Sequence, residues 1–193
     1  MLYLYDKALK EKFESVMPGK VIYAPVDKFY ERYLLSNDNH RLELPALSIW
    51  RSSFTIDKST IPSHLRIGNI RYPNNQNFTA EQFFSVRVEM SFQLDIWTST
   101  DIDRDVLLQE ILYFLTLYPY VSISYRDKKF TFPITIGDVS DSTDISSFEN
   151  TGDIYRLTLP IQIPDARLFY FEEVKTMKYI DLKLYCDDTE EKF

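Results

Sequence analysis

The sequence predicts an α+β domain in which one main helix packs on a face of a largely antiparallel or mixed sheet and a second helix forms the N-terminus. Residues 84–97 alternate apolar and polar side chains without a break, which is the period of a β-strand. Residues 100–118 have the capping residues and the apolar spacing of an α-helix. The expected order is helix, strands, long loop, strand, helix, hairpin and strand, so strands and helices do not alternate as they do in a parallel α/β sheet.

The N-terminal helix is predicted from an apolar stripe that ends before Pro18 and Gly19. Its members, at spacings of three and four, are Leu2, Tyr5, Leu9, Phe13 and Val16. VIYAP predicts a short strand and ELPALSIWR a second strand. The polar, tyrosine-rich segment KFYERYLLSNDNHR between them is interpreted as a connection.

Residues 51–82 are predicted to form a long polar loop, because they show no sustained period and contain Pro62, Gly68 and Pro73. A loop of about 30 residues is well beyond the usual upper range of about 12 to 15. Its scattered apolar residues indicate docking against a partner rather than a flexible linker.

The strand at 84–97 is unusually long. At about 3.3 Å per residue it would span roughly 46 Å, whereas ordinary strands have about 5 to 6 residues. We therefore expect part of it to pair with a neighbouring subunit. The alternative is that a bend or bulge divides it into two ordinary strands on one core.

The C-terminal half begins with the helix, for which we expect one apolar face made of Ile102, Val106, Ile111, Leu115 and Tyr118. VSISY and FTFPITI predict an antiparallel hairpin. IYRLTLPIQIPDA predicts a strand that lies at a sheet edge or turns Pro160 outward, because proline cannot donate a ladder hydrogen bond. YIDLKLYC predicts a last strand, and residues 186–193 a short acidic tail.

Composition limits the class of protein. The 193 residues suit a single domain, 1–193, and the net charge of −7 argues against binding nucleic acid by phosphate neutralisation. Cys186 is the one cysteine, so no intramolecular disulfide is expected. No stretch approaches 18 apolar residues, so we expect no membrane span and synthesis in a reducing cytoplasm.

We expect no catalytic residues, no metal and no cofactor. Four glycines cannot supply a dinucleotide or phosphate-binding loop, and His40 and His64 are interpreted as surface imidazoles. The aspartates of DVSDSTD do not have the spacing of a calcium loop, so turn formation explains them better. An enzyme with a carboxylate pair at Asp138 and Asp141 is the weakest alternative, and a module that stacks nucleic-acid bases lacks a basic groove.

Several side chains are candidates for contacts between subunits. Trp50 and Trp97 stand at strand ends beside Arg51 and Asp95, where a bulky anchor and a charged pair would hold an interface. The alternative is that both tryptophans complete a core. The candidate interface residues are Trp50, Arg51, Arg87, Glu89, Asp95, Trp97, Asp138 and Asp141.

The segments LPALSIWR, SFQLDIWTST, DRDVLLQEILYFL with its following YP, and DVSDSTDISSFENTGDIYRLTLPIQIPDARL occur in this order over roughly residues 45–168. In this respect the chain resembles the tail terminator, tail-completion and neck proteins of long-tailed bacteriophages. The first 44 and the last 25 residues depart from that pattern, which leaves another neck connector or a baseplate subunit open.

The resemblance implies a non-enzymatic virion protein of the tail or neck, assembled in the host cytoplasm. Such a subunit would form a hexameric ring that caps the tail tube or sheath, stops its growth and meets the head connector. It would use no cofactor. DNA would pass through the lumen of the ring without specific binding.

Overall fold

The computed structural model describes residues 1–34, 42–56, 67–71, 79–125, 128–142 and 154–173. Its elements in chain order are α1 (Leu2–Glu14), β1 (Val21–Tyr23), α2 (Val26–Phe29), the π-helix η1 (Tyr30–Leu34), β2 (Ala46–Ile56), β3 (Ile67–Arg71), β4 (Thr79–Thr98), α3 (Asp101–Leu117), β5 (Tyr120–Tyr125), β6 (Lys128–Pro133), β7 (Thr135–Ile136), β8 (Ser140–Asp141) and β9 (Tyr155–Glu173). The predicted α+β class with an N-terminal helix is confirmed.

The chain divides into two compact units, one made of residues 1–61 and 86–168 and the other of residues 62–85 and 169–193. In the second unit, β3 pairs antiparallel with the start of β4, from Ile67 opposite Phe83 to Arg71 opposite Thr79. The predicted loop at 51–82 is therefore wrong at three places, because β2 continues to Ile56, β3 lies within it and β4 begins inside it. The remaining residues of that loop, the predicted strand at 179–186 and the predicted tail at 186–193 lie outside the described residues.

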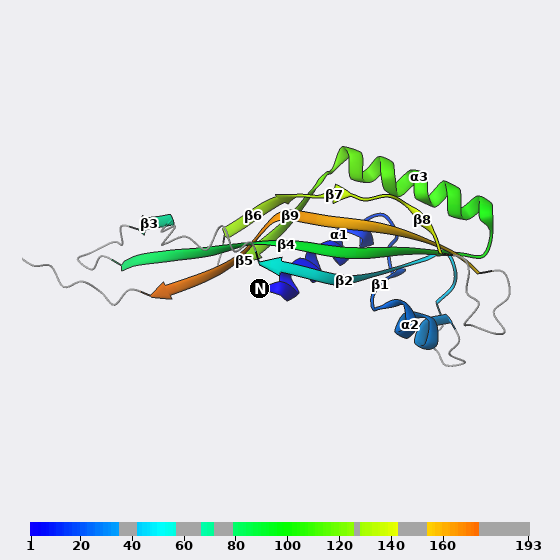
Figure 1. Ribbon diagram of the computed structural model, residues 1–193, viewed down its shortest axis with the longest axis horizontal. Helices are drawn as coiled ribbons and strands as arrows, with labels where there is room; N and C mark the ends of the chain where they lie inside the picture. Colours follow the sequence, from blue (N-terminus) through cyan, green and yellow to red (C-terminus); the bar gives the residue numbers. More distant parts are fainter. Residues whose placement is uncertain (35–41, 57–66, 72–78, 126–127, 143–153, 174–193) are drawn as a thin grey trace, which may run out of the picture. The chain divides into compact units, whose positions relative to one another are not determined.

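The main sheet has the strand order β1-β2-β4-β9-β7, with β3 also on β4 and β8 also on β9 (Figure 1). β1 runs parallel to β2, and β2 runs antiparallel to β4. Ion pairs join Arg87 to Asp165 and Asp95 to Arg156. The residue numbers therefore fall along β9 in the direction in which they rise along β4, so the two strands are antiparallel. The sheet is therefore mixed, as expected.

The long strand is one element, and both of its edges are occupied within the chain from Val88 to Trp97. Its residues from Val88 to Trp97 pair with β2, and β9 lies on its other side. The irregularity falls in β2, between Arg51 and Ser53, and does not divide β4. The expectation that part of 84–97 pairs with a neighbouring subunit is therefore wrong for residues 88–97, whose backbone groups already have partners in the same chain, and it stays a prediction for residues 84–87.

The apolar face of the sheet is covered by α1. Tyr5, Leu9 and Phe13 from its predicted stripe are fully buried, and so are alternate residues of β4 and β9. The hairpin of β5 and β6, which forms a separate two-stranded sheet, packs against the same helix through its contact between Phe132 and Tyr5. The chain leaves α1 through Gly19, whose φ of +74° favours glycine.

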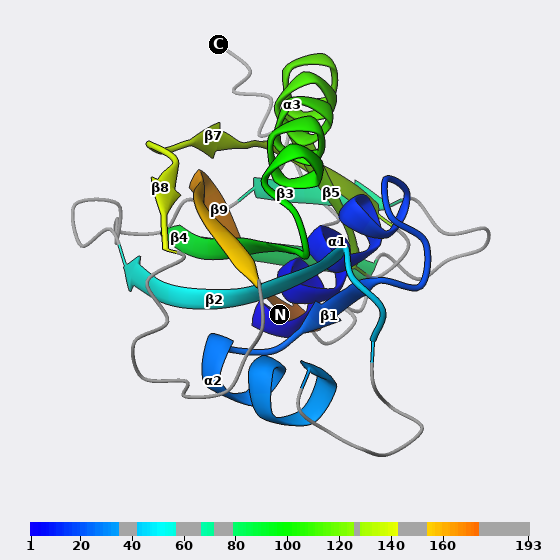
Figure 2. The same cartoon turned by 90° about the vertical axis from the view of Figure 1, so that its right-hand side faces the viewer.

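The opposite face of the sheet is covered by α2 and η1, which lie across β2 from α1 and α3 (Figure 2). The Trp97 ring stacks on Phe29 with their centroids 5.3 Å apart, and Tyr30 packs beside it. The segment interpreted as a polar connection is thus helical over part of its length. Among its charged residues, three side chains are buried and lie on one side of the helical segment. They are Phe29, Tyr30 and Leu34.

The predicted main helix is α3, and its start is as expected. Thr100 caps it by accepting a hydrogen bond from the Asp103 N–H at 3.1 Å. The expected apolar face is only partly correct. Leu107, Ile111 and Leu115 are buried, whereas Ile102 and Val106 lie on the exposed side.

Pro160 does not lie on an edge strand, because β9 has β4 on one side and β7 and β8 on the other. Its carbonyl accepts a hydrogen bond from Gly137 at 2.9 Å, and Gly137 lies between β7 and β8. The N–H and C=O of a strand residue point to the same side, so the missing donor faces this break in the neighbouring ladder. A Cβ on Gly137 would lie 3.1 Å from the Pro160 Cβ, so glycine permits the close approach.

A buried hydrogen bond joins the two strands beneath the tryptophan, and it gives a test of the fold. The Trp97 Nε1–H donates to Ser48 Oγ at 2.9 Å, and both residues are fully buried. Ser48→Ala leaves this donor without a partner, so we expect a loss of about 1–3 kcal/mol in the free energy of unfolding by urea.

The control is the same substitution in a Trp97→Phe background, where no indole N–H remains. There the cost of Ser48→Ala should fall by most of that amount. Equal costs in both backgrounds would show that the hydrogen bond does not stabilise the fold.

Candidate functional site

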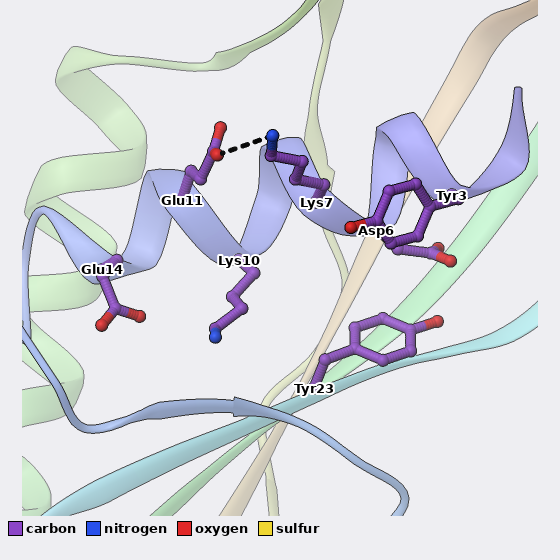
Figure 3. Close-up of a pocket in the computed structure, with 7 residues that line it drawn as sticks. All are labelled: Tyr3, Asp6, Lys7, Lys10, Glu11, Glu14 and Tyr23. Carbon is purple, nitrogen blue, oxygen red and sulfur yellow. Dashed lines mark ion pairs between the residues drawn. The ribbon is translucent and has the colours of Figure 1, made fainter.

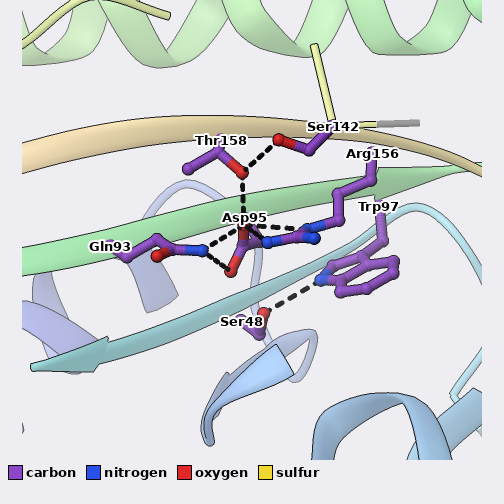
Figure 4. A network of polar contacts seen from close by, with 7 residues as sticks. All are labelled: Ser48, Gln93, Asp95, Trp97, Ser142, Arg156 and Thr158. Atoms are coloured by element: carbon purple, nitrogen blue, oxygen red, sulfur yellow. Dashed lines mark hydrogen bonds and ion pairs between the residues drawn. The ribbon is translucent and has the colours of Figure 1, made fainter. Parts of the chain in front are cut away.

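The first concentration of polar groups surrounds Asp95 on β4 (Figure 4). Arg156 on β9 donates to its Oδ1 from Nε at 3.0 Å and from Nη2 at 2.9 Å, and the Thr158 hydroxyl donates at 2.7 Å. Gln93 donates from Nε2 to both carboxylate oxygens. Asp95 is 0% exposed, so this is a closed structural network.

Two predicted interface residues therefore have internal roles. Asp95 is held by β9, and the Trp97 ring lies between Phe29 and the Arg156 guanidinium, which is 5.4 Å from its centroid. Neither Asp95 nor Trp97 has exposed surface in the single chain, so neither can touch another subunit while the fold is intact. The core alternative explains Trp97.

The other predicted interface residues are not brought together. Arg51 lies 3.6 Å from Asp6, Arg87 pairs with Asp165 at 2.6 Å, and Asp141 pairs with Arg104 at 3.3 Å. Trp50 is partly buried, and its Nε1 has no hydrogen-bond partner. Glu89 and Asp138 are exposed.

One exposed apolar surface lies on α3, on the side opposite its buried residues. Ile102, Val106, Tyr113 and Leu117 fall within about 60° of one another around a helix of 3.6 residues per turn. Ile102 is 76% exposed and Tyr113 is 68% exposed. We call these four residues the α3 outer stripe. The helix thus has two apolar faces, and only one of them is buried in this chain.

A second exposed apolar surface lies on the last part of β2. β1 pairs only with Leu47 to Ile49, and within the described residues no strand lies on the outer side of β2 from Trp50 to Ile56. Phe54 is 46% exposed and Ile56, two residues on, is 43% exposed. We call residues 50–56 the β2 edge. An exposed apolar edge strand tends to associate with other chains unless something covers it.

A pocket lies between α1 and β1 (Figure 3). Its volume is about 330 Å³, at the lower end of the roughly 300–1,000 Å³ range of small-ligand sites. Its lining residues are Tyr3, Asp6, Lys7, Lys10, Glu11, Glu14 and Tyr23. We call it the α1–β1 pocket.

Asp6 is the buried polar group of this pocket, with an exposed fraction of 8%. Its Oδ2 lies 3.6 Å from Arg51 Nη2. The Tyr23 hydroxyl accepts the Arg51 backbone N–H at 3.2 Å and is itself hydrogen-bonded to the Asp6 carboxylate. The other carboxylate oxygen of Asp6, Oδ1, has no hydrogen-bond partner, and the same is true of Glu14 Oε2.

Burial raises the pKa of Asp6 above its ordinary value of 3.8. The nearby Arg51 guanidinium, the Tyr23 hydroxyl and the N-terminal amine act in the opposite direction, and burial outweighs them. Burial likewise raises the pKa of the Tyr23 hydroxyl. The pocket therefore holds a carboxylate that lacks the full set of donors it would need to be stable as an anion.

Comparison with known proteins adds no assignment. The sequence matches no model of a protein family and no curated protein. Among the described residues, no group of three or more histidine, cysteine, aspartate or glutamate side chains is placed to hold a metal ion. The helices described here include none that is long and apolar enough to cross a membrane. His40, His64, Asp144 and Cys186 lie outside the described residues.

The sequence analysis did not identify the α1–β1 pocket or the two exposed surfaces. For Asp6 a signal exists, because a carboxylate stands beside Tyr5 within the apolar stripe of a short amphipathic helix. For α3, Ile102 and Val106 lie about 140° or more around the helix from Ile111, which a helical wheel reveals. The β2 edge has no such signal, because its exposure depends on the short length of β1.

The raised pKa of Asp6 predicts a specific dependence of stability on pH. The folded protein holds a proton on Asp6 in a pH range where the unfolded chain has released it. The stability from this group is therefore fully present below pH 3.8 and is lost as the pH rises through the folded-state pKa. Asp6→Asn removes this component.

The measurement is urea unfolding of both proteins across that range. The free energy of unfolding of the native chain, relative to Asp6→Asn, should fall with rising pH. Glu11→Gln removes an equal charge from an exposed part of the same helix and is the matched control. A native-minus-variant difference that stays constant for Asp6→Asn would contradict the prediction.

Proposed function

We propose that this chain is a structural subunit, not an enzyme, and that copies of it associate head to tail. The observation that carries the proposal is the pair of exposed apolar surfaces, the α3 outer stripe and the β2 edge, on one compact unit. Two different surfaces suit a head-to-tail contact, which closes into a ring when the rotation between neighbours allows it. A two-fold contact would need one self-complementary surface.

In the proposed contact, the α3 outer stripe of one copy covers the β2 edge of the next. Covering an exposed edge strand with a helix is a common way in which proteins protect such edges. Phe54 and Ile56 would meet Val106, Tyr113 and Leu117, so the contact would have an apolar centre with carboxylates of α3 at its margin. This assignment replaces the earlier expectation that β4 supplies the contact.

We further propose that the ring is that of a tail-completion or tail terminator protein of a long-tailed bacteriophage, in the tail or neck of the virion. Its partners there would be the tail tube or sheath protein and the head connector. The support is the resemblance over roughly residues 45–168 together with the two exposed surfaces. Electron microscopy of particles assembled without the protein tests this role. Tails of uncontrolled length would support a terminator, normal tails detached from heads a connector, and normal joined particles would refute both.

The head-to-tail contact predicts the behaviour of two surface variants. Val106→Ser with Leu117→Ser removes apolar area from the α3 outer stripe, and Ile56→Lys places a charge on the β2 edge. All three positions are exposed, so we expect the variants to fold. Native mass spectrometry at micromolar concentration should show closed oligomers for the native chain and monomers for each variant.

An equimolar mixture of the two variants distinguishes the type of interface. Each variant keeps one intact surface, so the mixture should give a dimer containing one of each and nothing larger. Gln109→Ser, which shortens an exposed polar side chain on the same side of α3, should assemble as the native chain does. A native chain that remains monomeric, alone and with tail tubes, or a mixture without dimers, would refute the contact.

A further inference from the structure

The α1–β1 pocket contains two buried acceptors that the described chain leaves without donors. One is Asp6 Oδ1 and the other is Glu14 Oε2, two helical turns further along α1. The other oxygen of Glu14, Oε1, accepts the Gly19 N–H at 2.8 Å, so only one of the two carboxylate oxygens has a donor. A buried acceptor without a donor costs about 1–3 kcal/mol, and more when it is charged. The pocket therefore favours a ligand that brings hydrogen-bond donors.

Two tyrosine rings lie near the Asp6 carboxylate. In Figure 3 the Asp6 carboxyl lies between the rings of Tyr3 and Tyr23. Tyr3 is largely exposed, and both rings line the same cavity. The face of an aromatic ring attracts a cation, and this attraction adds to that of a nearby carboxylate. The rings also provide apolar surface for the aliphatic part of a long side chain.

The charges of the lining favour a cation over an anion. It contains three carboxylates and two lysines, and Lys7 is already paired with Glu11 at 3.6 Å. The buried lining atoms that lack partners, on Asp6 and Glu14, are both oxygens, which would repel an anion. A metal ion would need more converging ligands than the described residues bring together.

We propose that the α1–β1 pocket binds a lysine or arginine side chain presented by a segment of another protein. The cationic head donates to Asp6 Oδ1, and the aliphatic stem packs against Tyr3 and Tyr23. The cavity of about 330 Å³ suits one long side chain rather than a folded element. This site is separate from the α3 outer stripe and does not depend on the proposed ring.

The test uses the full chain and four probes. These are acetylated, amidated Gly-Arg-Gly, Gly-Lys-Gly and Gly-norleucine-Gly, together with methylguanidinium as a free cation. Titrations are followed by amide chemical shifts, and shifts should be confined to α1, β1 and the start of the β2 edge. We expect both basic peptides to bind at least tenfold more tightly than the norleucine peptide. Tighter binding of Gly-Arg-Gly than of methylguanidinium supports a protein segment, whereas equal binding would refute that source.

Three variants locate the binding. Asp6→Asn should weaken the basic peptides at least tenfold, and Tyr3→Leu, at an exposed position, should weaken them by a smaller factor while retaining the apolar contact. Glu110→Gln removes an exposed carboxylate of α3 that does not line the pocket, so it should leave binding nearly unchanged. Tyr3→Leu remains informative if Asp6→Asn does not fold. Equal binding of the norleucine peptide, unchanged binding in both test variants, or no binding at millimolar concentration would each refute the proposal.

Discussion

The buried carboxylate of Asp95 sets the register on which the sheet depends. A charge removed from water is tolerated only when donors surround it, and here β9 supplies Arg156 and Thr158 while β4 supplies Gln93. A slip of one residue between β4 and β9 would turn Asp95 toward the apolar face beneath α1. The same register places the Arg156 guanidinium over Trp97, whose ring packs against Phe29 of α2 and Tyr30 of η1. The contacts of Asp95 therefore determine which side chains of β4 and β9 lie on each face of the sheet.

The exposure of the β2 edge results from the unequal lengths of β1 and β2. β1 is much shorter than β2, so the outer side of β2 is open beyond Ile49 among the described residues. Arg51 stands where the covered and uncovered parts meet, because it pairs with Asp6 in the α1–β1 pocket and belongs to the β2 edge. A residue of the β2 edge, Arg51, therefore contacts a residue that lines the pocket, Asp6. A partner that binds one of them acts close to the other.

Local patterns predicted most of the elements, and long-range packing decided the rest. The period of residues 84–97 and the cap at Thr100 gave a strand and a helix because each depends on neighbouring residues. Pairing partners are not local, so the sequence could not show that β4 is internal or that residues 67–71 form a strand. The edge position expected for Pro160 is wrong because the break beside it lies around Gly137, 23 positions away in the chain. Of the candidate interface residues, Asp95 and Trp97 were wrongly assigned to a subunit contact, because their internal partners, Arg156 and Ser48, are distant in the sequence.

The first helix is anchored by the last described strand, β9. The Tyr5 hydroxyl donates to the Arg167 carbonyl at 2.8 Å and accepts the Arg167 N–H at 2.9 Å, a separation of 162 residues. A ribosome that has made α1 must therefore continue through Arg167 before that hydroxyl can reach its partner. Until then the apolar stripe of α1 has no finished sheet to cover it. The contact that fixes the start of α1 can therefore form only after β9 has been synthesised.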